Sequence, residues 1–149
     1  MSAELRTEIE IRATPNRVWD ILTDFAAYPA WNPFIPRISG SLETGSQLDV
    51  QLQPPGGRGM RLRPTLLAAA PAKGLRWLGH VGVPGIFDGE HEFRIEPQGM
   101  DAVRFVQEER FSGLLAPFVL RFIERDTRQG FEAMNQALKA RAELPASTR

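Results

Sequence analysis

The order of two hydrophobic patterns is the feature that most constrains this chain. Residues 38–111 alternate apolar and polar side chains between short turns, with the period of two that is typical of half-buried strands. Residues 114–143 instead repeat apolar side chains at helical spacing, which predicts a rod of about 42 Å. Strands joined by short turns favour an antiparallel sheet. Because the last helix is the only element long enough to cover that sheet, we expect a curved sheet wrapped around it.

The start of the chain adds one strand and two short helices to this plan. Residues 5–12 alternate apolar and polar side chains, which predicts a first strand. Thr14 and Pro15 then predict a helix start, because threonine caps free amide groups and proline suits the first helical position. Two further prolines interrupt that helix, so residues 25–34 should form a second short helix and a turn.

Composition excludes several classes of protein. The 149 residues fit one domain, which we place at residues 1–144, followed by a disordered tail at 145–149. Eighteen basic and eighteen acidic residues cancel to a formal net charge of zero, so we expect no nucleic acid as partner. The chain has no cysteine, which excludes disulfides, thiolate metal sites and a cysteine nucleophile. With only two histidines besides, we expect no metal site.

The hydropathy pattern also bears on location. The first residues are charged and carry no apolar stretch of the kind that a signal peptide needs. No run reaches the roughly 18 apolar residues of a membrane span. We therefore expect a cytoplasmic protein without an integral membrane segment.

Four stretches of the chain carry a family resemblance. Residues 11–34 read IRATPNRVWDILTDFAAYPAWNPF, and they are followed by LRWLG at 75–79, GEHEF at 89–93 and ERFSGLL at 109–115. Together these stretches resemble the SRPBCC (START-like, Bet v 1-like) superfamily, and within it the polyketide cyclase/dehydrase and lipid-transport branch. The resemblance extends over almost the whole chain.

The resemblance implies a fold and leaves the activity open. It implies an α+β helix-grip fold, in which a curved seven-stranded antiparallel sheet wraps around a long C-terminal helix, with two short helices after the first strand. It also implies a deep hydrophobic cavity. We expect no cofactor. Because the superfamily includes lipid carriers, hormone receptors, cyclases, dehydratases and co-chaperone-like domains, the resemblance does not choose among these activities.

Three polar residues share the apolar face of the last two strands. By alternation, His91 lies on the face of Phe93 in its strand, and Gln107 and Glu109 lie on the face of Phe105 in theirs. Inward polar groups are the informative departure from a hydrophobic pattern. These three residues are therefore candidates to contact a ligand.

Charge complementarity predicts how these two strands pair. A turn around residues 99–101 places Glu96 opposite Arg104 and Glu90 opposite Arg110, and such cross-strand pairs are each worth roughly 0.2–1 kcal/mol. A register shifted by two would place like charges opposite each other in both positions. We therefore prefer the first register.

The preferred register brings His91 opposite Glu109 and leaves one conflict, because Glu92 then faces Glu108. A neighbouring imidazole and carboxylate can orient a ligand hydroxyl or carbonyl, or act as an acid–base couple. They can equally satisfy only each other or bound water. His91 and Glu109 are thus the catalytic candidates if the protein is an enzyme.

Aromatic and other inward residues complete the expected ligand site. We expect the ligand-binding set to comprise Trp31, Phe34, Trp77, Phe87, His91, Phe93, Phe105, Gln107, Glu109, Phe111, Phe118, Phe122 and Met134. The loops at 54–59 and 80–85 could gate this site. Gly79 and Gly89 lie at inward positions, where they leave room for a ligand or permit the sheet to bend. The charged residues of the last helix, Asp126 among them, are expected on its solvated face.

Three functions remain open from the sequence. The leading hypothesis is a carrier or sensor of an apolar molecule, lipid-like or polycyclic and polyketide-like, with a hydrophobic small molecule as its partner. The alternative is a polyketide cyclase, aromatase or dehydratase in which His91 is the base and Glu109 its partner. The third is a co-chaperone-like interaction module with a filled core. A homodimer is a possible assembly in each case.

Overall fold

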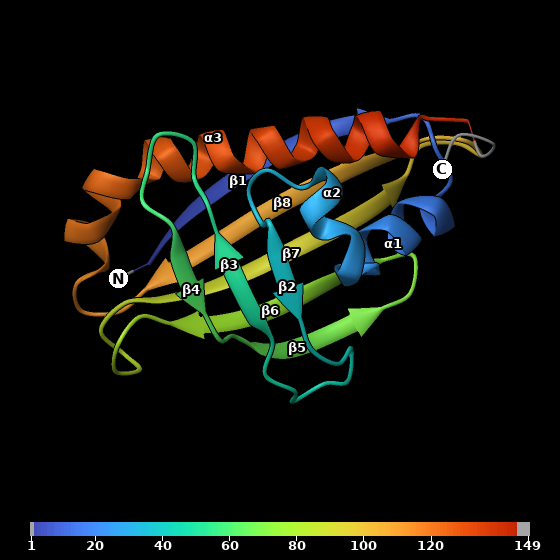
Figure 1. Cartoon of the computed structure of the whole chain (residues 1–149). Helices are drawn as coiled ribbons and strands as arrows, with labels where there is room; N and C mark the ends of the chain where they lie inside the picture. Colours follow the sequence, from blue (N-terminus) through green and yellow to red (C-terminus); the bar gives the residue numbers. More distant parts are fainter. Residues whose placement is uncertain (1, 146–149) are drawn as a thin grey trace.

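The structure is a computed structural model that describes residues 2–145 (Figure 1). Residues 146–149 of the expected tail lie outside the described residues. The elements in chain order are β1 (Ser2–Ile11), α1 (Pro15–Thr23), the 3-10 turn η1 (Phe25–Ala27), α2 (Tyr28–Trp31), β2 (Arg37–Ser39), β3 (Asp49–Leu52), β4 (Met60–Leu62), β5 (Thr65–Ala70), β6 (Gly74–His80), β7 (Asp88–Pro97), β8 (Val103–Ser112) and α3 (Ala116–Ala142). This is the α+β order that the sequence predicts.

The described residues form eight strands in two antiparallel sheets, so the expected number of seven is wrong. The larger sheet has the order β1-β8-β7-β6-β5, and the smaller has the order β2-β3-β4. Pro64 produces the additional strand, because it lacks a backbone N–H and divides the expected strand 60–70 into β4 and β5. A bridge between Gln47 and Thr65 continues the register of β3 on β4, so the two sheets join at this break.

The long helix α3 covers the larger sheet. It packs along β1, and it also contacts β8 and α1. Figure 1 shows α3 running the length of β1 and β8, while β2, β3 and β4 stand across the face of β6 and β7. The helix begins at Ala116 rather than at Leu114, because the N–H groups of Leu114 and Leu115 donate to the carbonyls of Gly85 and Ile86, at 3.0 and 2.8 Å.

The pairing of β7 and β8 confirms the register predicted from charge. Glu96 lies opposite Arg104, Glu90 opposite Arg110 and His91 opposite Glu109. Each of these pairs is cross-strand, so side chains of one pair project to the same face of the sheet. The charge pairs on the outward face therefore fix the register, and the register decides which inward residues of the two strands lie opposite each other.

One arginine resolves the conflict that this register leaves between two glutamates. Arg94 donates from Nη1 to Glu92 at 3.1 Å and pairs through Nη2 with Glu108 at 2.7 Å. Its Nε donates to Glu96 at 3.2 Å. Arg94 of β7 thus bridges the two glutamates. The prediction of the register considered only residues directly opposite each other, so it did not include this contact.

Candidate functional site

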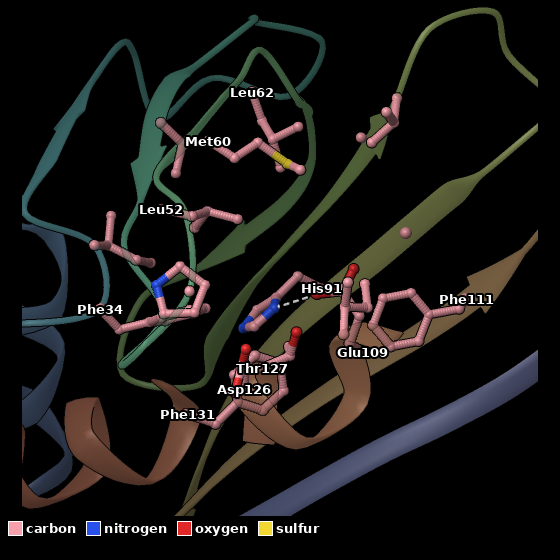
Figure 2. A pocket seen from close by; sticks show the side chains of 18 of the residues that line it. Phe34, Leu52, Met60, Leu62, His91, Glu109, Phe111, Asp126, Thr127 and Phe131 are labelled. Carbon is pink, nitrogen blue, oxygen red and sulfur yellow. Dashed lines mark hydrogen bonds and ion pairs between the residues drawn. The ribbon is translucent and has the colours of Figure 1, made fainter. Parts of the chain in front are cut away.

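A pocket of about 370 Å³ lies between the sheets and the middle of α3 (Figure 2). Residues of β3, β4, β6, β7, β8 and α3 line it, together with the loop between β3 and β4. Its aromatic wall consists of Phe34, Trp77, Phe87, Phe111 and Phe131. The volume falls within the range of about 300–1,000 Å³ that small-molecule sites occupy.

His91 and Glu109 form a close polar pair inside this mostly apolar pocket. The distance from His91 Nδ1 to Glu109 Oε1 is 2.6 Å, and the two side chains are 4% and 15% exposed. Figure 2 shows the pair side by side, with the imidazole on β7 and the carboxylate on β8. Because Oε1 of Glu109 faces the imidazole ring, the second carboxylate oxygen, Oε2, is the one that faces the pocket.

Two glycines make room beside the pair. A Cβ atom on Gly89 would lie 2.2 Å from Oε2 of Glu109, so the carboxylate extends across the space that a side chain would fill. Gly79 lies opposite Gly89 on β6, and a Cβ there would meet only Pro64, at an ordinary 3.6 Å. Both glycines line the pocket, but only Gly89 is required by the position of Glu109.

A chain of buried hydrogen bonds supports His91 from behind. His91 Nε2 lies 3.1 Å from Oε1 of Gln107, whose amide donates to Oδ1 of Asn135 at 2.7 Å and to the carbonyl of Phe131 at 3.3 Å. Asn135 in turn donates to the hydroxyl of Thr7 at 3.0 Å. The chain connects β7, β8, α3 and β1, so the imidazole is fixed by the fold as well as by Glu109.

Aromatic rings surround the imidazole on its remaining sides. Trp77 stacks on it with a centroid distance of 5.5 Å and an angle of 27°. Phe131 meets it edge to face at 5.0 Å, and Phe93 lies 4.3 Å away. Such an environment excludes water from the ring and holds its orientation through aromatic contacts.

The structure brings together about half of the residues predicted to bind ligand. The pocket is lined by Phe34, Trp77, Phe87, His91, Glu109 and Phe111. Four others are buried but lie outside the lining, namely Phe93, Phe105, Gln107 and Met134. Gln107 still acts on the site through His91, whereas Trp31 is only partly buried and does not line the pocket.

Phe118 and Phe122 do not belong to the lining, and the expectation for them is corrected. They are 63% and 82% exposed on the first half of α3. At about 100° per residue, they lie on the side of the helix opposite to Phe131. The apolar residues that repeat along this helix therefore belong to two of its faces. The inward face of its first half carries Val119 and Ile123.

Several lining residues escaped the sequence analysis. Asp126 and Thr127 line the pocket from α3, although Asp126 was expected on the solvated face. Val50 and Leu52 of β3 also line it, and their alternation was the available signal. The loop at 54–59 does border the pocket, through Pro54, Gly57 and Arg58.

Three further observations concern the rest of the residues that the structure describes. A second hollow of about 470 Å³ lies outside β2 and β3, and of its three charged residues Arg61 and Asp49 pair with each other while Arg37 is the third. No cluster of three or more potential metal ligands occurs within residues 2–145. Within the same residues, no helix is both long and apolar enough to cross a membrane.

Solved structures with the same fold include two enzymes. Zhui aromatase/cyclase from a Streptomyces species is 16% identical with a TM-score of 0.76, over 99% of this chain and 98% of that one. Norcoclaurine synthase from Thalictrum flavum is 14% identical with a TM-score of 0.71, over 95% and 94%. A START superfamily protein from Mycobacterium smegmatis is 23% identical with a TM-score of 0.71, over 94% and 97%. At these identities the likeness concerns the helix-grip fold.

The family itself is established by sequence. No protein with a curated description matches the chain. The sequence pattern of one family, described as polyketide cyclase/dehydrase and lipid transport, matches residues 2–143. This match covers nearly the whole chain and agrees with the helix-grip fold of the solved structures. The chain therefore belongs to the polyketide cyclase/dehydrase and lipid-transport family.

Proposed function

We propose that the protein binds a small, largely apolar molecule in the pocket between sheet and α3, as a carrier or sensor. The observation that carries this proposal is an apolar pocket of about 370 Å³ with one polar pair, His91 and Glu109, at its wall. The aromatic wall supplies the favourable burial of an apolar body, and the pair supplies a fixed point for one polar group.

Enzymatic turnover in the same pocket is the second candidate. The observation that favours it is the position of Glu109, whose Oε1 contacts His91 while Oε2 extends over Gly89. A carboxylate held in this way can accept a proton from a bound substrate, with His91 orienting it. This reverses the roles of base and partner from those expected by sequence. Two solved structures with this fold are named as an aromatase/cyclase and a norcoclaurine synthase, so the fold can support catalysis.

Native mass spectrometry of the purified protein tests the proposal. We expect a bound molecule that adds to the mass of the folded protein and is released on denaturing extraction. A bare mass, combined with failure of the folded protein to bind a hydrophobic dye, would overturn the proposal. That result would favour an interaction module that does not use the pocket.

Two substitutions then separate a carrier from an enzyme. A carrier should bind the extracted molecule saturably and return it unchanged, and His91→Gln should weaken binding only modestly. An enzyme should convert the molecule, and Glu109→Gln should reduce the rate by at least about 100-fold while binding is retained. Unchanged turnover in Glu109→Gln would exclude Glu109 as the catalytic base.

A further inference from the structure

We infer that the pocket selects a ligand that presents a hydrogen-bond donor, a hydroxyl or an ammonium group, to Oε2 of Glu109. This inference rests on the proposed function, because it concerns what the pocket binds. It differs from the general expectation that a histidine and a glutamate together could hold either a hydroxyl or a carbonyl. The argument concerns which polar atoms of the pocket are still free.

His91 has no ring nitrogen left for a ligand. Its Nδ1 contacts Oε1 of Glu109 at 2.6 Å, and its Nε2 contacts Oε1 of Gln107 at 3.1 Å. The ring is also enclosed by Trp77 and Phe131. His91 therefore acts on a ligand only through Glu109, and it is a positioning residue.

The orientation of Gln107 determines what His91 does. The Gln107 amide nitrogen faces two acceptors, the backbone carbonyl of Phe131 and Oδ1 of Asn135. Since a backbone carbonyl cannot donate, the amide oxygen of Gln107 must be the atom that faces His91. Nε2 of His91 then donates to Gln107, and the one proton between Nδ1 and Oε1 of Glu109 leaves Oε2 without a proton, as a hydrogen-bond acceptor.

The second oxygen of Glu109 is the unsatisfied polar atom of this pair. Within residues 2–145 it has no hydrogen bond or ion pair, and it lies where a Cβ of residue 89 would be. Of the other ionisable residues that line the pocket, Asp126 is also an acceptor, and Arg58 belongs to an exposed loop. A carboxyl oxygen that carries no proton accepts hydrogen bonds and donates none, so a ligand carbonyl at this place would be repelled.

Three naphthalene probes test this inference: naphthol, its methyl ether and the corresponding naphthaldehyde, all substituted at the same ring position. Isothermal titration calorimetry gives their affinities for the full chain. A hydrogen bond to a charged acceptor should make naphthol bind about tenfold or more tightly than the ether or the aldehyde. Equal or tighter binding of the aldehyde would overturn the inference.

The Glu109→Leu variant removes this acceptor. Leucine has no polar atom to place over Gly89, so the naphthol preference should disappear. The matched control is Asp126→Asn, which removes the other lining carboxylate and should keep the preference. The same loss of preference in Asp126→Asn would assign donor recognition to Asp126 and overturn the inference.

The outcomes separate this inference from the proposed function. If none of the three probes binds the wild-type chain, the proposed binding of small apolar molecules fails, and the inference fails with it. If all three bind with similar affinity, the proposed function stands and the inference alone fails. The wild-type comparison decides this even where a variant does not fold.

Discussion

At the scale of the residue, Glu109 reaches its position only because residue 89 has no side chain. Gly89→Ala would place a Cβ 2.2 Å from Oε2, so the carboxylate would have to move away from its present position. We expect this variant to bind naphthol at least about tenfold more weakly than wild type, because the charged acceptor is lost. Calorimetry measures the affinity, and the unfolding curve shows that the fold is kept.

The matched control for this prediction is Gly79→Ala, on the strand paired with Gly89. Its Cβ would meet only Pro64, at 3.6 Å, and alanine in a strand is more stable than glycine by roughly 0.5–1 kcal/mol. We expect this variant to be as stable as wild type or more so, with affinity changed by less than about threefold. Equal loss of binding in both variants would mean that pocket volume, and not Glu109, sets the affinity.

Gln107 carries the second prediction at this scale. It is fully buried and contacts His91 on one side and Asn135 on the other. Gln107→Leu leaves both partners without their hydrogen bonds, so the free energy of unfolding should fall by about 1–3 kcal/mol. Chemical denaturation measures it, and the exposed Gln51→Leu, expected within about 0.5 kcal/mol of wild type, is the control. A neutral Gln107→Leu would contradict the buried chain of hydrogen bonds.

At the scale of the element, the charged outer face of β1, β7 and β8 predicts how stability depends on pH. The hydrogen bond from Arg94, reinforced by Arg6, lowers the pKa of Glu108 below its ordinary value of 4.5 despite partial burial. The folded state thus binds fewer protons than the unfolded state in acid. The stability that Glu108 contributes is present above about pH 4.5 and is lost as the pH falls through the lower pKa of the folded state.

Glu108→Gln tests this statement. The variant should lose part of its unfolding free energy near neutral pH and should show a smaller further loss below pH 4.5 than wild type does. Because Arg94 also pairs with Glu92 and Glu96, the effect near neutral pH should stay within about 1 kcal/mol. Urea denaturation at several pH values gives both numbers. Parallel pH profiles for the two proteins would contradict the assignment.

Substitutions in the first half of α3 test which residues line the pocket and which lie on the surface. Phe118 and Phe122 are exposed, so Phe118→Ser and Phe122→Ser should leave naphthol affinity and stability close to wild type. Phe111→Ser should reduce both, because Phe111 is buried, lines the pocket and stacks on Phe87. Weaker binding in either α3 variant would mean that the ligand extends beyond the pocket onto this face.

Some features of these strands and of α3 could be predicted from the sequence, and others could not. The register of β7 on β8 was predictable because oppositely charged residues pair at four positions on the outward face of the sheet. The division at Pro64 changed the strand count, since a proline in a strand allows both an edge position and a break. The aromatic residues of α3 were misassigned because apolar spacing alone does not separate the two faces of a helix whose first half is partly exposed.

Part of the candidate site could be predicted from the sequence, and part of it could not. Strand alternation and register sufficed for His91 and Glu109, which lie on the two central strands of the larger sheet. The role of Gln107 depends on Asn135 and Thr7, which are far away in sequence and meet only after α3 packs on β1. The free oxygen of Glu109 depends on Gly89, a relation between side chains that alternation cannot show.

At the scale of the whole molecule, the pocket is where three separately supported parts meet. The larger sheet contributes β6, β7 and β8, the smaller contributes β3 and β4, and α3 contributes its middle turns. The smaller sheet joins the larger one at the break after Pro64, and α3 lies mainly along β1. A molecule in the pocket would therefore contact parts that otherwise meet over a limited area, and binding should restrict their relative motion.

Hydrogen–deuterium exchange with and without naphthol tests this coupling. At a free concentration 100 times the dissociation constant, binding stabilises the folded state by about 2.7 kcal/mol, which slows exchange through global unfolding everywhere. Residues 52–60 and 123–131 both border the pocket, so their exchange should slow beyond that common amount. Strand β1 lies outside the lining and should show the common effect alone. Additional protection at residues 25–29 and 37–39 instead would place the ligand in the polar hollow beside Arg37 and contradict the assignment of the pocket.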